Sequence, residues 1–93
     1  MDMRQAKVLI LGGTGTLGRA LTKMLLEESP GVQITILSRD EHKQAQMRRE
    51  FPAAKYMLGD IRDRSAMFSV MRGIDVVFHV AALKHVDTLE ENV

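Results

Sequence analysis

Three glycines at three-residue spacing follow the first apolar run of the chain. The stretch from Lys7 to Gly18 reads K-V-L-I-L-G-G-T-G-T-L-G, with glycine at positions 12, 15 and 18. Gly12 permits a tight turn, Gly15 lets a pyrophosphate approach the backbone, and Gly18 lets a helix pack closely against its strand. The N–H groups and the positive dipole end of that helix attract a phosphate anion. The spacing therefore predicts a turn that binds the diphosphate of a dinucleotide.

The context of these glycines decides between two interpretations. A glycine-rich turn is by itself also compatible with a simple tight connection between a strand and a helix. Here an apolar run precedes the glycines, an amphipathic stretch follows, and a second strand is predicted about twenty residues further on, as a dinucleotide fold requires. This arrangement favours nucleotide binding.

The residues after the second predicted strand bear on which dinucleotide binds. Ser38 is followed three residues later by Glu41, a capping box that predicts the start of the second helix. The same position contacts the adenosine ribose in dinucleotide folds, where an acid suits the 2′-hydroxyl of NAD and an arginine suits the 2′-phosphate of NADP. Because Ser38 and Arg39 occupy it, we expect NADP, with NAD as the less favoured alternative.

Asp60 and Ile61 follow the third predicted strand, at the edge of the sheet where open α/β folds bind ligands. The Asp60 carboxylate can accept a hydrogen bond from the adenine amino group while the Ile61 side chain packs on the ring. A loop aspartate that only caps its neighbours fits the local sequence equally well.

Strands and helices are expected to alternate along the whole chain. The strands are predicted at Val8–Leu11, Val32–Leu37, Ala54–Leu58 and Asp75–Val80, and the helices at Thr16–Glu28, Asp40–Glu50 and Arg64–Arg72. This alternation predicts an α/β fold with a Rossmann-type parallel sheet in the strand order 3-2-1-4. The sheet would be incomplete, because the fourth strand has no predicted partner beyond it. Its apolar edge would be available for self-association or for another chain.

The apolar periodicity also predicts which side chains are buried. The second helix offers only Ala45 and Met47, and His79 is expected to be a hydrogen-bonded core residue within the fourth strand. The first helix is predicted to bury one stripe, and the third helix another. These stripes are Leu17, Ala20, Leu21, Met24 and Leu25, and Ala66, Met67, Val70 and Met71.

Composition bounds the class of protein. The 93 residues suffice for one small domain, and 45% hydrophobic with 27% charged residues are ordinary values for a globular protein. A net charge of +1 favours neither nucleic acid nor an anionic membrane as a partner. The sequence contains no cysteine, which excludes disulfides and thiolate metal sites, and no metal site is predicted. The first residues match neither a signal peptide nor a membrane span, so we expect a cytoplasmic protein.

Four motifs in order carry a resemblance to a known family. The segments G-G-T-G-T-L-G, S-R-D-E, G-D-I-R-D and V-F-H-V-A-A-L-K-H-V resemble the N-terminal part of an extended short-chain dehydrogenase/reductase. More narrowly, they are similar to the polysaccharide-biosynthesis branch, with its inverting UDP-N-acetylglucosamine 4,6-dehydratases and nucleotide-sugar epimerases. The resemblance implies that residues 1–93 form the N-terminal part of an NAD(P)-binding Rossmann domain, and that the intact protein acts on a nucleotide sugar.

The resemblance also implies a role for each motif residue in binding NADP. Ser38 and Arg39 would hold the 2′-phosphate, and Asp60 and Ile61 would flank the adenine. Ala81, Ala82 and Lys84 would line the path to the nicotinamide ribose. The residues that would hold the pyrophosphate are Gly12, Thr14, Gly15, Thr16, Leu17 and Gly18.

The sequence departs from this family in its catalytic apparatus. Catalysis there relies on a tyrosine followed four residues later by a lysine, whereas the only tyrosine here, Tyr56, is followed by Asp60. We therefore predict no catalytic residue within this chain. Three hypotheses follow: the cofactor-binding segment of a nucleotide-sugar dehydratase or epimerase, a stand-alone NADP-binding regulatory or interaction module, and a fragment that binds nothing.

Overall fold

Residues 5–12 and 14–80 are described by a computed structural model of the chain. They form four strands and three helices in strict alternation. In chain order these are β1 (Lys7–Leu11), α1 (Thr16–Glu28), β2 (Gln33–Ser38), α2 (Glu41–Glu50), β3 (Lys55–Leu58), α3 (Arg64–Val70) and β4 (Val76–His79). The first helix has the bounds predicted from the sequence, and the other elements start or end within two residues of the prediction.

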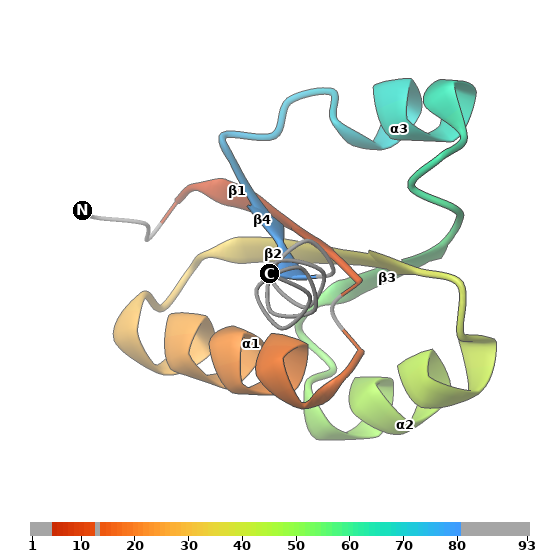
Figure 1. Cartoon of the computed structure of the whole chain (residues 1–93). Coiled ribbons are helices and arrows are strands. Elements are labelled where there is room, and N and C mark those ends of the chain that lie inside the picture. Colours follow the sequence, from red (N-terminus) through yellow and green to blue (C-terminus); the bar gives the residue numbers. More distant parts are fainter. Residues whose placement is uncertain (1–4, 13, 81–93) are drawn as a thin grey trace, which may run out of the picture.

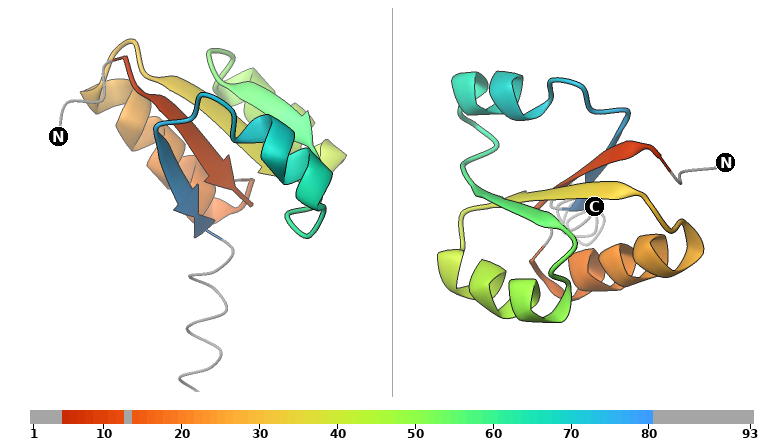
Figure 2. Two further views of the ribbon diagram at one scale, coloured as in Figure 1. Left: turned by 90° about the horizontal axis from the view of Figure 1, so that it is seen from above. Right: turned by 180° about the vertical axis from the view of Figure 1, so that it is seen from behind.

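The four strands form one parallel sheet in the order β3-β2-β1-β4. The central pair is in register from Lys7 opposite Gln33 to Leu11 opposite Leu37. Helices α1 and α2 cover one face of the sheet and α3 lies over the other (Figures 1 and 2). The predicted Rossmann-type architecture and its strand order are therefore confirmed.

The larger part of the core lies between the sheet and the α1–α2 layer. Alternate residues of β1 and β2 point into this layer, and Leu25 from α1 and Met47 from α2 pack against them. The β-branched and leucine-rich character of these strands follows from burial on both faces of a parallel sheet. The strand side chains that are 0–2% exposed in this layer are Val8, Ile10, Ile34 and Ile36.

The core under α3 is smaller. Leu9, Leu11 and Leu37 pack there with Val70, the single buried residue of α3. Ala66 and Met67 are half-buried, and Met71, which the periodicity placed in the core, is 45% exposed. The prediction for Met71 is wrong: α3 ends at Val70, and Met71 is its exposed C-cap rather than a residue of the buried stripe.

The buried face of α1 differs from the predicted stripe. Its buried residues are Gly18, Thr22 and Leu25, whereas Leu17 and Met24 are 51% and 45% exposed. Ala20 is exposed and Leu21 is half-buried. A threonine can lie on the inner face because its hydroxyl donates to the carbonyl oxygen of Gly18 at 2.8 Å. The helix is thus rotated about its axis relative to the prediction, and the side that contains Gly18 faces the sheet.

The start of α2 corrects the predicted capping box. Asp40 is the N-cap, and its carboxylate accepts a hydrogen bond from the backbone N–H of Lys43 at 2.9 Å. Ser38 still belongs to β2, because its carbonyl oxygen accepts from the N–H of Gly59 in the sheet ladder. Met47 is buried as predicted, but its buried companion on α2 is Gln44, and Ala45 is exposed.

Strand β4 is an edge in the part of the chain that the structure describes, where it pairs only with β1. Its side chains alternate between half-buried and exposed, and His79 is exposed. The expectation of a core histidine is therefore wrong. His79 and Val77 lie on the face of the sheet opposite α1 and α2, and the short helix α3 leaves them exposed. Across residues 5–12 and 14–80, none of the helices combines the length and the apolar character needed to span a bilayer.

Candidate functional site

A hollow of about 360 Å³ opens at the carboxyl ends of β1, β2 and β3. Ligands of open α/β sheets bind at this edge. Leu37 and Arg62 line it together with five of the residues predicted to bind the cofactor, which are Gly12, Ser38, Arg39, Asp60 and Ile61. The turns after three different strands thus bring these residues together.

The glycine turn borders this hollow. Gly12 has a φ of 73°, which non-glycine residues rarely adopt, and its N–H donates to the carbonyl oxygen of Leu37 at 2.8 Å. Gly15 is the N-cap of α1 and has an ordinary extended conformation, with φ of −82° and ψ of −176°. A Cβ at Gly15 would meet no atom within 4 Å. Neither backbone conformation nor packing therefore requires glycine at position 15.

The other predicted diphosphate residues surround the start of α1. Thr16 and Leu17 are exposed on the first turn, and Thr14 and Gly18 are buried. Within the described residues no side chain caps this helix, and its first turn carries no acidic residue. The first N–H groups of α1 are therefore available to an acceptor from outside the helix.

Ser38 is fixed by a residue that the sequence analysis missed. The Gln44 side-chain amide donates to the Ser38 hydroxyl oxygen at 2.9 Å and to the Met57 carbonyl oxygen at 2.7 Å. Because the hydroxyl accepts here, its own hydrogen is left to donate elsewhere. A sign of this role was the position of Gln44 one helical turn before Met47, on the face that α2 turns to the sheet.

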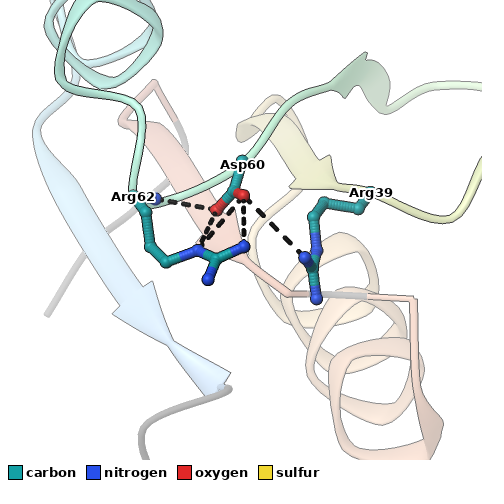
Figure 3. A network of polar contacts seen from close by, with 3 residues as sticks. All are labelled: Arg39, Asp60 and Arg62. Carbon is teal, nitrogen blue, oxygen red and sulfur yellow. Dashed lines mark hydrogen bonds and ion pairs between the residues drawn. The ribbon is translucent and has the colours of Figure 1, made fainter.

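Asp60 lies between two arginines (Figure 3). The Arg62 guanidinium donates to both carboxylate oxygens, with Nε at 3.2 Å from each and Nη2 at 2.8 Å from Oδ2. The backbone N–H of Arg62 donates to Oδ1 at 2.9 Å. From the other side, Nη1 of Arg39 lies 3.8 Å from Oδ2. Two positive charges therefore surround one negative charge at the rim of the hollow.

These contacts lower the pKa of the Asp60 carboxyl group from 3.8 to about 2. The main cause is the hydrogen bonding from the Arg62 side chain, followed by that from its backbone N–H; the Arg39 charge adds to the effect. The same pairing raises the pKa of the Arg62 guanidinium. Asp60 is therefore ionised throughout the neutral range, and the cluster keeps a net positive charge that favours an anion.

The structure shows the local role that the sequence left open for Asp60. Its side chain accepts from the N–H two residues ahead, and its carbonyl oxygen accepts from the N–H of Asp63 at 2.9 Å. Asp60 thus has a structural role in the turn, and its contact with adenine remains a prediction. Arg62 was not predicted as a site residue, although the spacing Asp-x-Arg after a strand is the signal that could have indicated it.

Tyr56 has a structural role in this fold. Its hydroxyl donates to the carbonyl oxygens of Phe51 at 2.7 Å and Met47 at 3.2 Å, at the end of α2. Burial raises the pKa of Tyr56, which the charges of Arg48 and Arg19 only partly offset. A tyrosine that acts as a base needs the opposite shift. The predicted nicotinamide-ribose residues Ala81, Ala82 and Lys84 lie outside the described residues.

Residues 8–93 match the profile of the family described as "Polysaccharide biosynthesis protein". The chain belongs to this family. It is 46% identical to a UDP-N-acetylglucosamine 4,6-dehydratase (inverting) of Campylobacter jejuni over 87 residues, which are 91% of this chain and 26% of that enzyme. It is 42% identical to a UDP-glucose 4-epimerase of Rickettsia akari, covering 89% of this chain and 26% of the relative.

Two solved structures resemble the fold of this chain. Pen from Bacillus thuringiensis superposes with a TM-score of 0.78 at 39% identity, over 86% of this chain and 26% of that one. WbmF from Bordetella bronchiseptica, solved in complex with NAD+ and UDP, superposes with a TM-score of 0.68 at 26% identity, over 84% of this chain and 23% of that one. The chain thus spans about a quarter of the length of these relatives. The family expected from the four motifs is confirmed.

Proposed function

We propose that this chain is the NADP-binding segment of a nucleotide-sugar 4,6-dehydratase or epimerase of polysaccharide biosynthesis, with a UDP-N-acetylhexosamine as the substrate of the whole protein. The observation that carries the proposal is the hollow at the carboxyl end of the sheet, where Gly12, Ser38, Arg39, Asp60 and Ile61 meet. The names of the Campylobacter and Rickettsia relatives support the class of substrate.

The diphosphate would bind between Gly12 and the first turn of α1. Gly15 supports this placement, since a side chain there would project into open space rather than into the protein. The remaining reason for a glycine is a ligand that comes close to the backbone. The uncapped N–H groups of α1 would donate to the diphosphate oxygens, with Thr14, Thr16, Leu17 and Gly18 shaping the turn around them.

The adenosine end would lie over Asp60 and Ile61, with its 2′-phosphate at Ser38 and Arg39. The Arg39 side chain is 70% exposed and lines the hollow, so its guanidinium is accessible to a phosphate. The Ser38 hydroxyl, which accepts from Gln44, keeps a hydrogen to donate. The Bordetella neighbour was solved with NAD+, so the preference for NADP rests on these two residues alone.

The bound cofactor would supply a hydride acceptor and donor to the whole protein. This chain would bind and orient it, with Ala81, Ala82 and Lys84 proposed to continue the path toward the nicotinamide ribose. Tyr56 would contribute no proton transfer, because its hydroxyl is bound to main-chain carbonyl oxygens. We assign no catalytic role to any residue of the described part of the chain.

Isothermal titration calorimetry of the 93-residue chain with NADP+ and NAD+ tests the proposal. We expect NADP+ to bind more tightly. Replacing Arg39 with alanine should weaken NADP+ by about 1.5 to 3 kcal/mol, which is the cost of a lost charge-assisted contact, and leave NAD+ nearly unchanged. Arg49→Ala, on the exposed side of α2, is the matched control and should change neither affinity.

Three results would contradict the proposal. Tighter binding of NAD+ would overturn the role of Arg39 in selecting NADP. An equal loss for both cofactors in Arg39→Ala would show that this residue supports the fold of the hollow instead. Absence of binding for either cofactor would show that the described hollow is not sufficient as a site.

A further inference from the structure

The Asp60 carboxylate is shared unequally by two arginines that line the same hollow. We propose that Arg62 is a positioning residue for cofactor selection: by holding Asp60, it leaves the Arg39 guanidinium free to bind the 2′-phosphate. This inference rests on the proposed function, and it assigns to Arg62 a role in choosing between NADP and NAD.

The contacts show which arginine holds the carboxylate. Arg62 makes hydrogen bonds to both oxygens from its guanidinium and a further one from its backbone N–H. Arg39 approaches Oδ2 alone, at 3.8 Å, which is beyond hydrogen-bond distance. Both guanidinium groups approach Oδ2, and the contact with both carboxylate oxygens belongs to Arg62 alone (Figure 3).

The chain connectivity explains why Arg62 has the stronger contact. It lies two residues after Asp60 in the same turn, and the bond from its backbone N–H to Oδ1 fixes the orientation of the carboxylate. Because Asp60 and Arg62 belong to the same turn, their pairing fixes few side-chain torsion angles beyond those of the turn, and its cost in conformational entropy is small. Arg39 comes from the end of β2, and its side chain stays 70% exposed. The preferred pair is therefore Asp60 with Arg62, and Arg39 is the cation that faces the hollow with the weaker attachment.

Removal of the Arg62 side chain changes the partner of Asp60. The carboxylate stays ionised, and Arg39 is the guanidinium next to it, so the two form the closer pair. Arg39 then has to leave this pair before it can bind a 2′-phosphate, and the phosphate meets a carboxylate that has lost its main partner. NAD has no phosphate at this position, so its binding does not depend on release of Arg39. The measurable consequence is a change in the ratio of the two affinities.

The decisive experiment compares the NADP+ to NAD+ affinity ratio in variants of the 93-residue chain by calorimetry. Arg62→Ala should lower this ratio about two- to fivefold, the range of an exposed ion pair. Arg62→Ala combined with Asp60→Asn should restore it, because the neutral amide no longer holds Arg39. Arg62→Lys should lie in between. Arg64→Ala, an exposed arginine outside the hollow, is the control and should leave the ratio unchanged.

A measurement without ligand tests the carboxylate sharing itself. NMR titration of the Asp60 side-chain carboxyl carbon should show a pKa that stays below 3.8 in Arg62→Ala and rises further when Arg39→Ala is added, while the backbone N–H of residue 62 still lowers it. An unchanged ratio in Arg62→Ala, or a ratio that Asp60→Asn does not restore, would overturn the inference. So would an Asp60 pKa in Arg62→Ala that does not respond to removal of Arg39.

The two proposals fail in different ways. A wild-type chain that binds neither cofactor overturns the proposed function, and the selection role of Arg62 falls with it. A wild-type chain that prefers NADP+, together with an Arg62→Ala variant of the same preference, overturns only the role of Arg62.

Discussion

The connections from β2 to α2 and from β3 to α3, called the β2–α2 and β3–α3 crossings, contain similar local signals. Different kinds of contact fix their side chains. Both turns end in an aspartate N-cap: Asp40 accepts from the N–H of Lys43 at 2.9 Å, and Asp63 accepts from the N–H of Ala66 at 3.2 Å. In the β2–α2 crossing, buried neutral hydrogen bonds from Gln44 hold the turn. In the β3–α3 crossing, exposed ion pairs around Asp60 hold it.

This difference separates stability from ligand binding. Neutral hydrogen bonds and apolar packing around α2 support the β3 edge of the sheet, and their loss leaves unsatisfied groups or a cavity. Exposed ion pairs contribute little to stability, but they set the charge and the titration of the hollow. We therefore expect substitutions in the first crossing to change unfolding free energy and those in the second to change affinity and pH dependence.

The largest expected effect is the loss of stability in Met47→Ala, compared with Met71→Ala at the end of the other helix. Met47 on α2 is 0% exposed, whereas Met71 at the end of α3 is 45% exposed. Met47→Ala should reduce the free energy of unfolding by about 2 to 5 kcal/mol, because it leaves a cavity under the sheet. Met71→Ala should cost less than about 1 kcal/mol. Urea denaturation followed by circular dichroism measures both, and equal losses would contradict the comparison.

A smaller loss is expected from the neutral hydrogen bonds of Gln44. Gln44→Leu keeps a side chain of similar size but leaves the Met57 carbonyl oxygen and the Ser38 hydroxyl without this partner. We expect a loss of about 1 to 3 kcal/mol in unfolding free energy. Gln46→Leu, two residues away on the exposed side of α2, is the control and should stay within about 0.5 kcal/mol of the wild type. If the two variants were equally stable, Gln44 would not hold the turn.

The sequence predicted the elements of this fold better than their orientation. Glycine positions and apolar periodicity act locally, so the bounds of α1 could be predicted, and the strand order follows from the fold that the alternation of strands and helices indicates. The rotation of α1 could not. The observed buried face, with Gly18, Thr22 and Leu25, is shifted by one position along the helix from the predicted stripe, and the choice between the two depends on how closely Gly18 lets the helix approach the sheet.

For the candidate site, main-chain geometry was more predictable than side-chain pairing. The carboxyl ends of parallel strands share one edge, so the meeting of Gly12, Arg39 and Asp60 at one hollow follows from topology. The pairing of Asp60 with Arg62 depends on side-chain rotamers within one turn, and the buried role of Gln44 depends on the register of α2 against β3. The spacing of Gln44 from Met47 and of Arg62 from Asp60 points to these positions, but it does not determine which side-chain atoms pair.

The smallest expected effect is the pH dependence contributed by the ion pairs of Asp60. Its pKa in the folded chain is about 2, below the value of 3.8 that applies when the contacts are lost on unfolding. A carboxyl group with a lowered pKa stabilises the folded state fully above pH 3.8, and the contribution disappears as the pH falls through 2. Asp60→Asn should therefore lack this part of the acid dependence, and Arg62→Ala should reduce it by raising the Asp60 pKa toward 3.8. Unfolding free energies measured by urea denaturation from pH 6 down to about 2 test this. A difference between wild type and Asp60→Asn that stays constant across that interval would show that the ion pairs around Asp60 do not couple its ionisation to folding.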